Sequence, residues 1–371
     1  MIKTAVIMAG GSGERFWPLS KQTKPKQLLN LINEDKTMLE DSIDRILDII
    51  PAENIFIITG EKIVENIKSI VKSIPSDNII AEPFKRNTAP CLALASAVIN
   101  AKFSGVEYQN EQIITAVLTS DHVMTPIETF QNDVNLAIEY ASNNKSIVTI
   151  GIVPTKAETG YGYIELADVI LEKENGKIYN AKSFKEKPNL ELANEYYNSG
   201  NYYWNSGMFF YDLDYFNTEL NRCQPNVGGK INEMTDLIKL QSNYESGVKE
   251  TSSIFEQMPD ISIDYALMEK TPNVAVVKSN FNWDDLGSWD SIEKYVNREN
   301  ENNIKGKAIT IDAKDNIIFN YSNDKLIAVL GLDDFIIVNS DDVIMICPKD
   351  KAQDVKKIVN ELKAQNKQEL L

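Results

Sequence analysis

Glycines and cations gather just after the first apolar run of the chain, Thr4–Met8. The segment Gly10–Gly13 has the sequence GGSG, and glycines directly after a buried strand let backbone N–H groups approach phosphate oxygens. Four cations follow within twelve positions of a chain that is otherwise acidic: Arg15, Lys21, Lys24 and Lys26. Arginine can fork onto phosphate oxygens, and lysine can act as a point charge. The stretch therefore indicates a phosphate-binding loop, and a tight turn with a solvated basic loop is the alternative.

This loop matches neither of two common phosphate motifs. Gly10 and Gly13 stand too close together for a Walker A loop, and no Gly-Lys-Ser follows them. Arg15 occupies the place where the dinucleotide-binding fingerprint would continue toward its third glycine. Pro18 and Pro25 disfavour a continuous helix, so we expect a loop over the edge of a sheet.

Two widely separated acidic segments could hold the cation that a phosphate-transfer reaction needs. Asp121 follows the apolar run Ile113–Leu118, whereas Asp284 and Asp285 stand together in the aromatic segment Phe281–Trp289. One or two carboxylates, together with phosphates and water, suffice to bind Mg²⁺. Each aspartate by itself is also a common cap or turn residue, so this second role stays open.

Other segments carry side chains suited to a nucleoside or a sugar. Ala81–Pro90 is a polar turn before a helix, in which Asn87 or Thr88 could simply cap that helix. Aromatic residues, amides and charges alternate in three later segments: Thr159–Tyr163, Phe184–Pro188 and Trp204–Met208. Carbohydrate sites combine such groups, but an edge strand with an aromatic core would have the same pattern.

Short apolar runs alternate with amphipathic stretches over about the first 150 residues. The runs are Thr4–Met8, Ile55–Thr59, Ile113–Leu118 and Ile147–Ile152. The stretches are Met38–Ile50, Glu61–Ile74, Ala89–Phe103 and Glu128–Ser142, the first with Thr37 and Glu40 at capping-box spacing. This alternation predicts an α/β fold: a Rossmann-like mixed, mostly parallel sheet with helices on both faces and ligands at the carboxyl ends of its strands.

Residues 304–347 change in character. Short β-rich runs are separated by Asp, Asn and Gly at roughly ten-residue spacing, which predicts a small β-rich, β-helix-like module. A final helix is expected at about 351–365. We place a catalytic domain at residues 1–290 and a C-terminal β-rich domain with this helix at 291–371. The C-terminal domain is expected to dock either on its own catalytic domain or on a second subunit, in which case the chain is a homodimer.

The bulk composition of the 371 residues excludes several classes of protein. A formal net charge of -16 disfavours a broad basic face for nucleic acid, and no run of about 18 apolar residues predicts a membrane span. The N-terminus lacks the long apolar region of a signal peptide. His122 is the one histidine, so a multi-histidine zinc site cannot form. Three scattered cysteines, Cys91, Cys223 and Cys347, are typical of reduced thiols in a cytoplasmic protein.

The sequence from Gly10 to Ser20, with Lys24-Pro-Lys-Gln after it, resembles the signature of the sugar nucleotidyltransferases. The resemblance implies that Arg15 and Lys26 bind and activate a nucleoside triphosphate. It also implies that Asp121 and Asp285 chelate one Mg²⁺, with Asp284 at a variable position of the pattern. The nucleotide-binding residues then include Gly10, Gly11, Ser12, Gly13 and Ser120.

Glu82-Pro-Phe-Lys-Arg-Asn-Thr-Ala-Pro90 closely resembles a stretch of the mannose-1-phosphate guanylyltransferases within that family. The resemblance implies that guanine packs near Glu82 and Pro83, and that Arg86, Asn87 and Thr88 order this loop or touch the nucleotide. It further implies a sugar-phosphate site, in which Glu186 holds sugar hydroxyls and Lys187 the phosphate. The other expected members of this site are Gly162 and Asn205. The segment Ser262–Lys270 is expected to be a helix that buttresses the sugar pocket.

The resemblance thus implies transfer of GMP from GTP to mannose 1-phosphate, giving GDP-mannose and pyrophosphate by in-line attack on the α-phosphorus. Two alternatives remain at this point. One is the same chemistry on another hexose 1-phosphate or nucleotide, and the other is a non-catalytic relative that binds a nucleotide sugar. Some relatives carry a fused zinc-dependent isomerase domain, and the chain is expected to lack that activity because it ends early and lacks the histidines.

Overall fold

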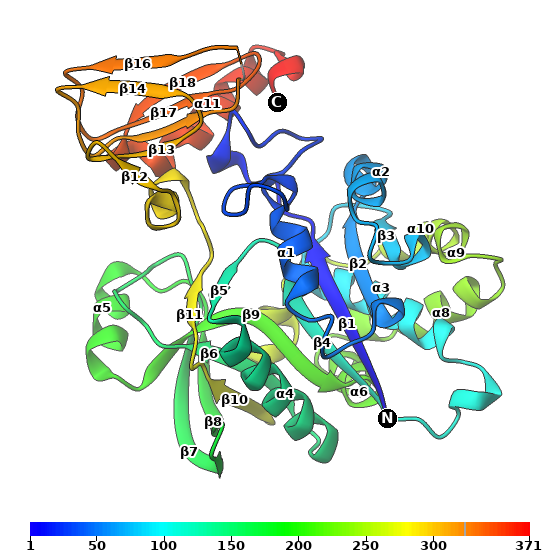
Figure 1. Ribbon diagram of the computed structural model, residues 1–371. Helices are drawn as coiled ribbons and strands as arrows, with labels where there is room; N and C mark the ends of the chain where they lie inside the picture. Colours follow the sequence, from blue (N-terminus) through cyan, green and yellow to red (C-terminus); the bar gives the residue numbers. More distant parts are fainter. Residues whose placement is uncertain (323) are drawn as a thin grey trace. The chain divides into compact units, whose positions relative to one another are not determined.

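The computed structural model describes residues 1–322 and 324–371 (Figure 1). The chain forms two compact units, each assembled from segments that lie far apart in sequence. Unit 1 contains residues 1–9, 43–119 and 124–283, and unit 2 contains residues 10–42, 120–123 and 284–371. The chain therefore passes from one unit to the other five times.

Unit 1 is built on a nine-stranded sheet with the order β3-β2-β1-β4-β9-β6-β10-β8-β7. Its strands are β1 (Ile2–Ala9), β2 (Ile55–Gly60), β3 (Ile79–Glu82), β4 (Ile113–Thr119), β6 (Ile147–Ile152), β7 (Tyr163–Lys173), β8 (Gly176–Lys185), β9 (Tyr202–Asp212) and β10 (Val274–Lys278). The pairs β1–β2, β1–β4, β2–β3 and β6–β10 are parallel, whereas β9 runs antiparallel to both β4 and β6. The predicted mixed sheet is thus confirmed.

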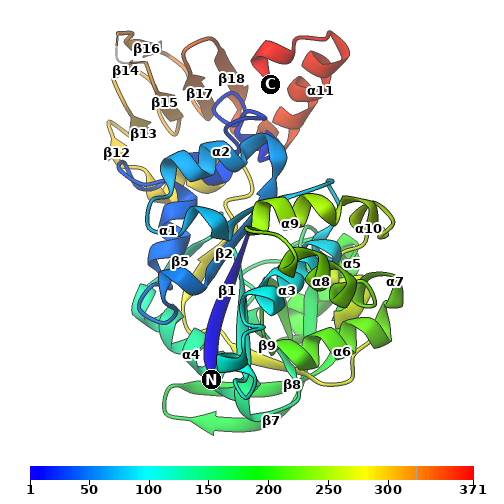
Figure 2. The same ribbon diagram turned by 90° about the vertical axis from the view of Figure 1, so that its right-hand side faces the viewer.

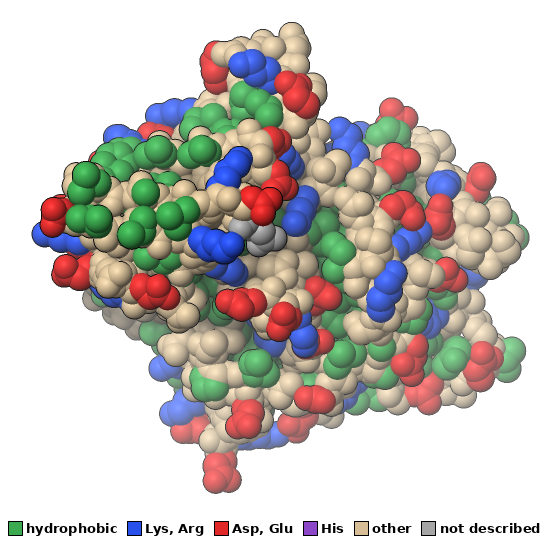
Figure 3. All heavy atoms as spheres, turned by 45° about the horizontal axis from the view of Figure 1, so that its top comes forward, with side chains coloured by type: hydrophobic (Ala, Val, Ile, Leu, Met, Phe, Trp, Pro, Cys, Tyr) green, Lys and Arg blue, Asp and Glu red, His purple; other side chains and the backbone are tan. Residues whose placement is uncertain are grey.

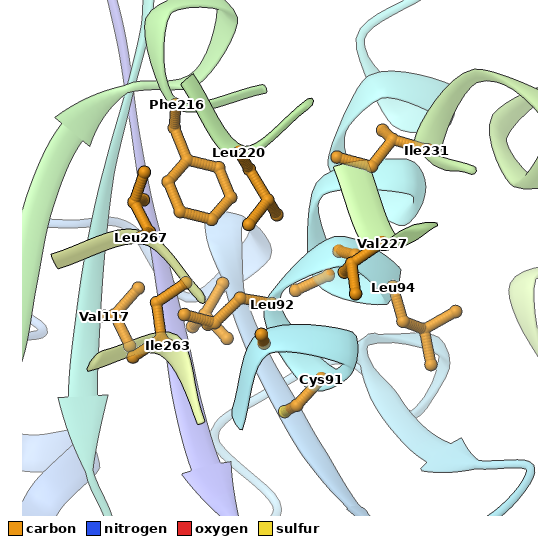
Figure 4. Packing of buried hydrophobic residues seen from close by; sticks show 14 of the residues in the cluster. Cys91, Leu92, Leu94, Val117, Phe216, Leu220, Val227, Ile231, Ile263 and Leu267 are labelled. Carbon is orange, nitrogen blue, oxygen red and sulfur yellow. The ribbon is translucent and has the colours of Figure 1, made fainter. Parts of the chain in front are cut away.

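Helices cover both faces of this sheet, as the sequence predicts. The helices of unit 1 are α2 (Glu61–Ile70), α3 (Thr88–Lys102), α4 (Ile127–Asn143), α5 (Leu190–Ser199), α6 (Leu213–Cys223), α7 (Pro225–Gly228), α8 (Ile231–Lys239), α9 (Tyr244–Glu250) and α10 (Ser252–Glu256). Helix α4 lies on one face, and α3, α6 and α8 lie on the other (Figure 2). Figure 4 shows the apolar core beneath the second face, where Leu92, Phe216 and Leu267 pack together.

Several predicted helices differ from the expectation in length or type, among them α2, which ends at Ile70 rather than Ile74, and the final helix, which begins at residue 355 rather than about 351. The α1 helix (Met38–Asp44) has the predicted capping box, since Thr37 N–H donates to Glu40 at 2.9 Å and Glu40 N–H donates to the Thr37 hydroxyl at 3.2 Å. It ends earlier than predicted because the Ile46 and Ile49 N–H groups donate to carbonyls only three residues back, at 3.0 and 2.9 Å. The helix expected over 262–270 is instead a short π-helical turn, Asp264–Met268. Within the described residues, no helix is both long enough and apolar enough to cross a bilayer.

The C-terminal part of unit 2 is a short stack of parallel β-coils. Its strands are β12 (Arg298–Glu299), β13 (Asn302–Lys305), β14 (Ala308–Ile311), β15 (Ile317–Asn320), β16 (Ile327–Leu330), β17 (Phe335–Asn339) and β18 (Ile344–Pro348), followed by helix α11 (Val355–Ala364). The pairs β13–β15, β15–β17 and β14–β16 are parallel and in register. Asparagines stack at the corners, where Asn316 donates to Asn302 and Asn339 donates to Asn320, both at 2.8 Å. Strands β5 (Val123–Thr125) and β11 (Asn282–Asp284) pair where the chain changes unit.

One apolar core joins this C-terminal stack to the glycine-rich loop within unit 2. Phe16 packs against Trp289 with ring centroids 5.1 Å apart, and Trp289 packs against Phe319 of β15 at the same distance. The indole N–H of Trp289 donates to the Trp17 carbonyl at 3.1 Å, and that of Trp17 donates to the Leu370 carbonyl at 2.9 Å. The C-terminal module therefore docks on residues 10–42 of its own chain.

Candidate active site

The predicted site residues divide between the two units, with the phosphate and metal residues in unit 2 and the base and sugar residues in unit 1. In unit 2 they surround one cavity of about 330 Å³. It is lined by Ser12, Gly13, Glu14, Arg15, Phe16, Lys26, Asp121, His122, Asp285, Leu286, Gly287 and Lys356. The two candidate metal ligands, Asp121 and Asp285, thus line the same cavity although they lie 164 positions apart in the sequence.

Lys26 is the most deeply placed cation of this cavity. Its side chain is 6% exposed, and its ammonium donates to the Asp121 carboxylate at 2.9 Å and to the Asp285 carbonyl at 2.6 Å. The Phe16 ring covers it with a centroid 5.8 Å from the nitrogen. A buried ammonium is stable only when it is paired and hydrogen-bonded, so Lys26 ties both aspartate segments to the glycine-rich loop.

Gly13 shapes the loop around Lys26. Its φ is +60°, and a Cβ at this position would lie 2.4 Å from the Lys26 Cβ and 2.9 Å from the backbone nitrogen of Lys26. Gly10 and Gly11 differ, because a Cβ at either would meet no atom within 4 Å. Only Gly13 is therefore required by backbone conformation and close approach, whereas the first two glycines leave an open backbone. The Ser20 hydroxyl donates to the Ser12 carbonyl at 2.8 Å and closes the turn.

The two neighbouring aspartates of the second acidic segment have different surroundings. Asp284 is buried, accepts the Leu286 N–H at 2.8 Å and pairs with Lys294 at 2.5 Å, so it holds the turn in place. Asp285 instead faces the cavity. Leu286 follows at a φ of +43°, a conformation that a branched side chain rarely adopts and that costs about 1–3 kcal/mol. This strain is typical of functional turns.

Opposing effects set the charge of Asp121. Burial favours the neutral carboxyl, but the charges of Lys26 and His122 outweigh it and hold the pKa of Asp121 below its usual value. His122 lies with its Nε2 3.7 Å from the Asp121 carboxylate. Asp121 is thus ionised at neutral pH and suited to a hard divalent cation. Ser120, directly before it, is buried.

In unit 1, the turn between β3 and α3 carries the predicted base-binding residues. Glu82 and Pro83 line a cavity of about 360 Å³ beside the edge strand β3. Burial raises the pKa of Glu82 to about 7, and its Oε1 has no hydrogen-bond partner among the described residues. Asn87 caps α3 by accepting the Thr88 N–H at 2.9 Å, so the capping alternative is correct for this residue.

The predicted sugar residues also converge within unit 1. A Cβ on Gly162 would lie 2.5 Å from the Glu186 carboxylate and 3.4 Å from the Asn205 Cβ, so the absence of a side chain leaves room for both. The Gly162 carbonyl accepts the Asn205 N–H at 2.8 Å. Lys187 has a φ of +46° and pairs with Glu186 at 3.1 Å. Four predicted residues are thus neighbours, although they come from three strands and loops.

Sequence reasoning missed Asp264 as a member of this cluster. Its carboxylate accepts the Asn205 side-chain amide at 2.9 Å. Burial and the nearby charge of Glu186 raise the pKa of Asp264 to about 6. The residue directly before Asp264 is also held in place, because the Ile263 N–H donates to the Thr88 hydroxyl at 2.8 Å. The sequence signal was the segment Ser262–Lys270, whose resemblance to the same enzymes implied a helix that buttresses the sugar pocket rather than a contact with the sugar.

Comparison with known families gives these two clusters a context. The nucleotidyl transferase family model matches residues 4–302. The chain belongs to the nucleotidyl transferase family. A second model, the MannoseP isomerase/GMP-like beta-helix domain, matches residues 306–362, which agrees with the parallel coils of β14 to β17. The resemblance predicted from the motifs is thus confirmed.

Named relatives of this nucleotidyl transferase match it over almost its whole length. It is 38% identical to the mannose-1-phosphate guanylyltransferase RfbM of Salmonella typhimurium, over 98% of this chain and 73% of that protein. It is 37% identical to a mannose-1-phosphate guanylyltransferase of Salmonella muenchen, over 98% of this chain and 74% of that protein. A crystal structure described as mannose-1-phosphate geranyltransferase from Thermus thermophilus is 28% identical, has a TM-score of 0.81, and covers 98% of this chain and 100% of its own.

Replacing Gly13 by alanine should strain the loop that carries Lys26. We expect the free energy of unfolding to fall by about 1–3 kcal/mol, because the positive φ and the contact with Lys26 both disfavour a Cβ. Urea denaturation followed by fluorescence measures the change. Gly10→Ala is the matched control and should leave stability unchanged, since its Cβ meets open space. Equal stability of the two variants would contradict the role given to Gly13.

Proposed function

We propose that this chain is a mannose-1-phosphate guanylyltransferase, which transfers GMP from GTP to mannose 1-phosphate and releases pyrophosphate. One observation carries the proposal: the Lys26 ammonium joins Asp121 to the Asp285 segment in a cavity edged by the glycine-rich loop. The names of the relatives at 37–38% identity support this choice of substrates. Residues 1–290, which include the phosphate loop, are then the transferase domain, and residues 291–371 are the C-terminal β-rich domain, which packs against that loop.

Asp121 and Asp285 are the proposed ligands of Mg²⁺. Both are carboxylates, both line the same cavity, and oxygen donors suit a hard divalent cation. The described residues contain no group of three or more His, Cys, Asp or Glu side chains placed to hold a metal. Two carboxylates are nevertheless enough, because phosphate oxygens and water complete the coordination of Mg²⁺ in such sites. When bound, the metal would neutralise part of the triphosphate charge.

The residues of the chain then act by position and charge rather than by covalent chemistry. Arg15, Lys26 and the backbone of Gly10–Gly13 bind the triphosphate. An oxygen of mannose 1-phosphate attacks the α-phosphorus, the bond from that phosphorus to the bridging oxygen breaks, and pyrophosphate leaves with the electron pair. No general base is needed, because the attacking phosphate is already an anion. Alignment and electrostatic stabilisation account for the acceleration.

For the sugar phosphate, we propose that Glu186, Asn205 and Asp264 hold hydroxyl groups and that Lys187 meets the phosphate. The support is their convergence on Gly162, together with the Asn205–Asp264 hydrogen bond. Two carboxylates side by side offer several acceptors to neighbouring hydroxyls.

The substitution Asp264→Asn tests this assignment of the sugar hydroxyls. It should raise the KM for mannose 1-phosphate and leave the KM for GTP unchanged.

The protein is further proposed to act as a cytoplasmic homodimer. All three cysteines are free thiols, which supports a reducing compartment. Exposed apolar side chains gather over the C-terminal β-rich part (Figure 3), among them Ile309, Ile311, Leu330, Ile344 and Ile346. Pairing of this face between two copies would cover it, and Leu330→Glu should then halve the mass measured by sedimentation.

A pyrophosphate-release assay tests the reaction. Purified protein with GTP, mannose 1-phosphate and Mg²⁺ should release pyrophosphate and form GDP-mannose. A panel that replaces GTP by UTP, dTTP or ATP, and mannose 1-phosphate by glucose 1-phosphate, should give much slower release. Lys26→Ala should lose orders of magnitude in rate, because it removes the cation that joins both aspartate segments. Tight GDP-mannose binding without turnover would instead favour a non-catalytic relative.

The raised pKa of Glu82 predicts a pH dependence of GTP affinity. Guanine presents N1–H and N2–H₂ donors, so it should bind the ionised carboxylate, and the carboxyl is half protonated at about pH 7. Affinity for GTP should therefore rise as pH increases from 6 to 8, which calorimetric titration would measure. Glu82→Gln should bind more weakly and lose this rise. Ionisation of the γ-phosphate of GTP affects the titration of wild-type and variant protein equally. An identical pH dependence in Glu82→Gln would therefore disprove the contact between Glu82 and guanine.

A further inference from the structure

We infer that Lys356, in the C-terminal helix α11, is a ligand of the leaving pyrophosphate. This inference rests on the proposed function and adds a residue that the motifs of the transferase part do not contain. Lys356 lies within the segment matched by the β-helix family model, beyond the segment matched by the nucleotidyl transferase model. It nevertheless lines the same cavity as Lys26, Asp121 and Asp285.

Contacts on either side of Lys356 fix its place at this cavity. Helix α11 packs against the short turn Glu14–Phe16 of the glycine-rich loop. Lys363, seven positions further along the helix and hence on the same face, pairs with Glu14 at 2.6 Å. Before the helix, Gln353 donates to the Ser288 hydroxyl at 2.7 Å, directly after Gly287 of the cavity wall. The first turn of α11 is thus held between the glycine-rich loop and the Asp285 segment.

The charges of the cavity require a further cation. Its lining has three cationic side chains, Arg15, Lys26 and Lys356, and three anionic ones, Glu14, Asp121 and Asp285. Without Lys356 the side chains of the lining would carry a net negative charge, so Lys356 adds to the attraction that the proposed Mg²⁺ would exert on a nucleoside triphosphate. Lys26 is already engaged by Asp121, and Glu14 is engaged by Lys363. Among the described residues, the nearby charge that acts on Lys356 is that of Asp354, which is itself paired with Lys357 at 2.9 Å, so the Lys356 ammonium remains available to a ligand.

Position along the cavity indicates which phosphates Lys356 meets. Lys26 is buried beside both aspartates, where the metal and the reacting α-phosphate belong. Arg15 and Lys356 are exposed, on the solvent side of the cavity. A leaving group must depart toward solvent, so these two cations are suited to the β- and γ-phosphates. An ammonium can stabilise the charge that develops there as the bond to the α-phosphorus breaks.

Substitution of Lys356 tests this assignment with a neighbouring control. In Lys356→Ala, we expect the KM for GTP and the KM for pyrophosphate in the reverse reaction to rise about ten- to a hundredfold. Lys356→Arg should retain most of the affinity. The dissociation constant of GDP-mannose should be unchanged in both, because this product lacks the pyrophosphate group that leaves. Lys357→Ala is the control: Lys357 is adjacent, exposed and paired with Asp354 at 2.9 Å, and its loss should change none of these constants.

The outcomes separate this inference from the proposed function. If the wild-type protein forms GDP-mannose and Lys356→Ala matches Lys357→Ala in every constant, Lys356 is no ligand and the inference is overturned. Equal weakening of GTP, pyrophosphate and GDP-mannose would also overturn it, because a general charge effect would then explain the loss. A wild-type protein that releases no pyrophosphate would refute the proposed function instead.

Discussion

The pairing of the buried Lys26 ammonium is the constraint on which the unit 2 site depends. Burying a lysine costs free energy unless its charge is met by partners at close range. Asp121 and the Asp285 carbonyl meet it, and they reach it from two segments that are distant in sequence. Each of these segments must therefore be held in one place, and the positive-φ residues Gly13 and Leu286 lie within or beside them. Gly13 makes room for Lys26, Leu286 adopts a strained φ, and Asp284 anchors the turn before it.

A similar dependence joins the two clusters of unit 1. The Thr88 hydroxyl, at the start of α3, accepts the Ile263 N–H, and the next residue, Asp264, accepts the Asn205 amide. The turn that carries Glu82 and the cluster around Gly162 are thus connected by a short path of hydrogen bonds through one π-helical turn. Such turns are frequent at functional sites, since the wider helix shifts the direction of one side chain relative to the next. Here the shift places Asp264 beside Asn205.

The sequence was most informative where chemistry imposes a local pattern. Apolar runs located β1, β2, β4 and β6 to within two residues at either end, because a buried parallel strand must be apolar throughout. The combination of glycines and cations pointed to the phosphate loop, whereas the choice of Asp121 and Asp285 rested on the family resemblance. The division into units could not be predicted, since residues 10–42 belong with residues 284–371 through packing of Phe16, Trp289 and Phe319. Lys356 and Asp264 escaped notice for the same reason: only tertiary contacts bring them to their sites.

The five passages of the chain between the units have a consequence for how such proteins can change over time. The parallel coils form one contiguous segment of the sequence, which recombination could in principle exchange or remove. The buried apolar side chains of the coils, however, form one core with Trp17, Leu19 and Leu31 of the segment that contains the glycine-rich loop. Loss of the coils would expose those side chains to water and remove the packing that holds the loop in place. The coils and the loop are therefore expected to be inherited together, with substitutions in one matched by substitutions in the other.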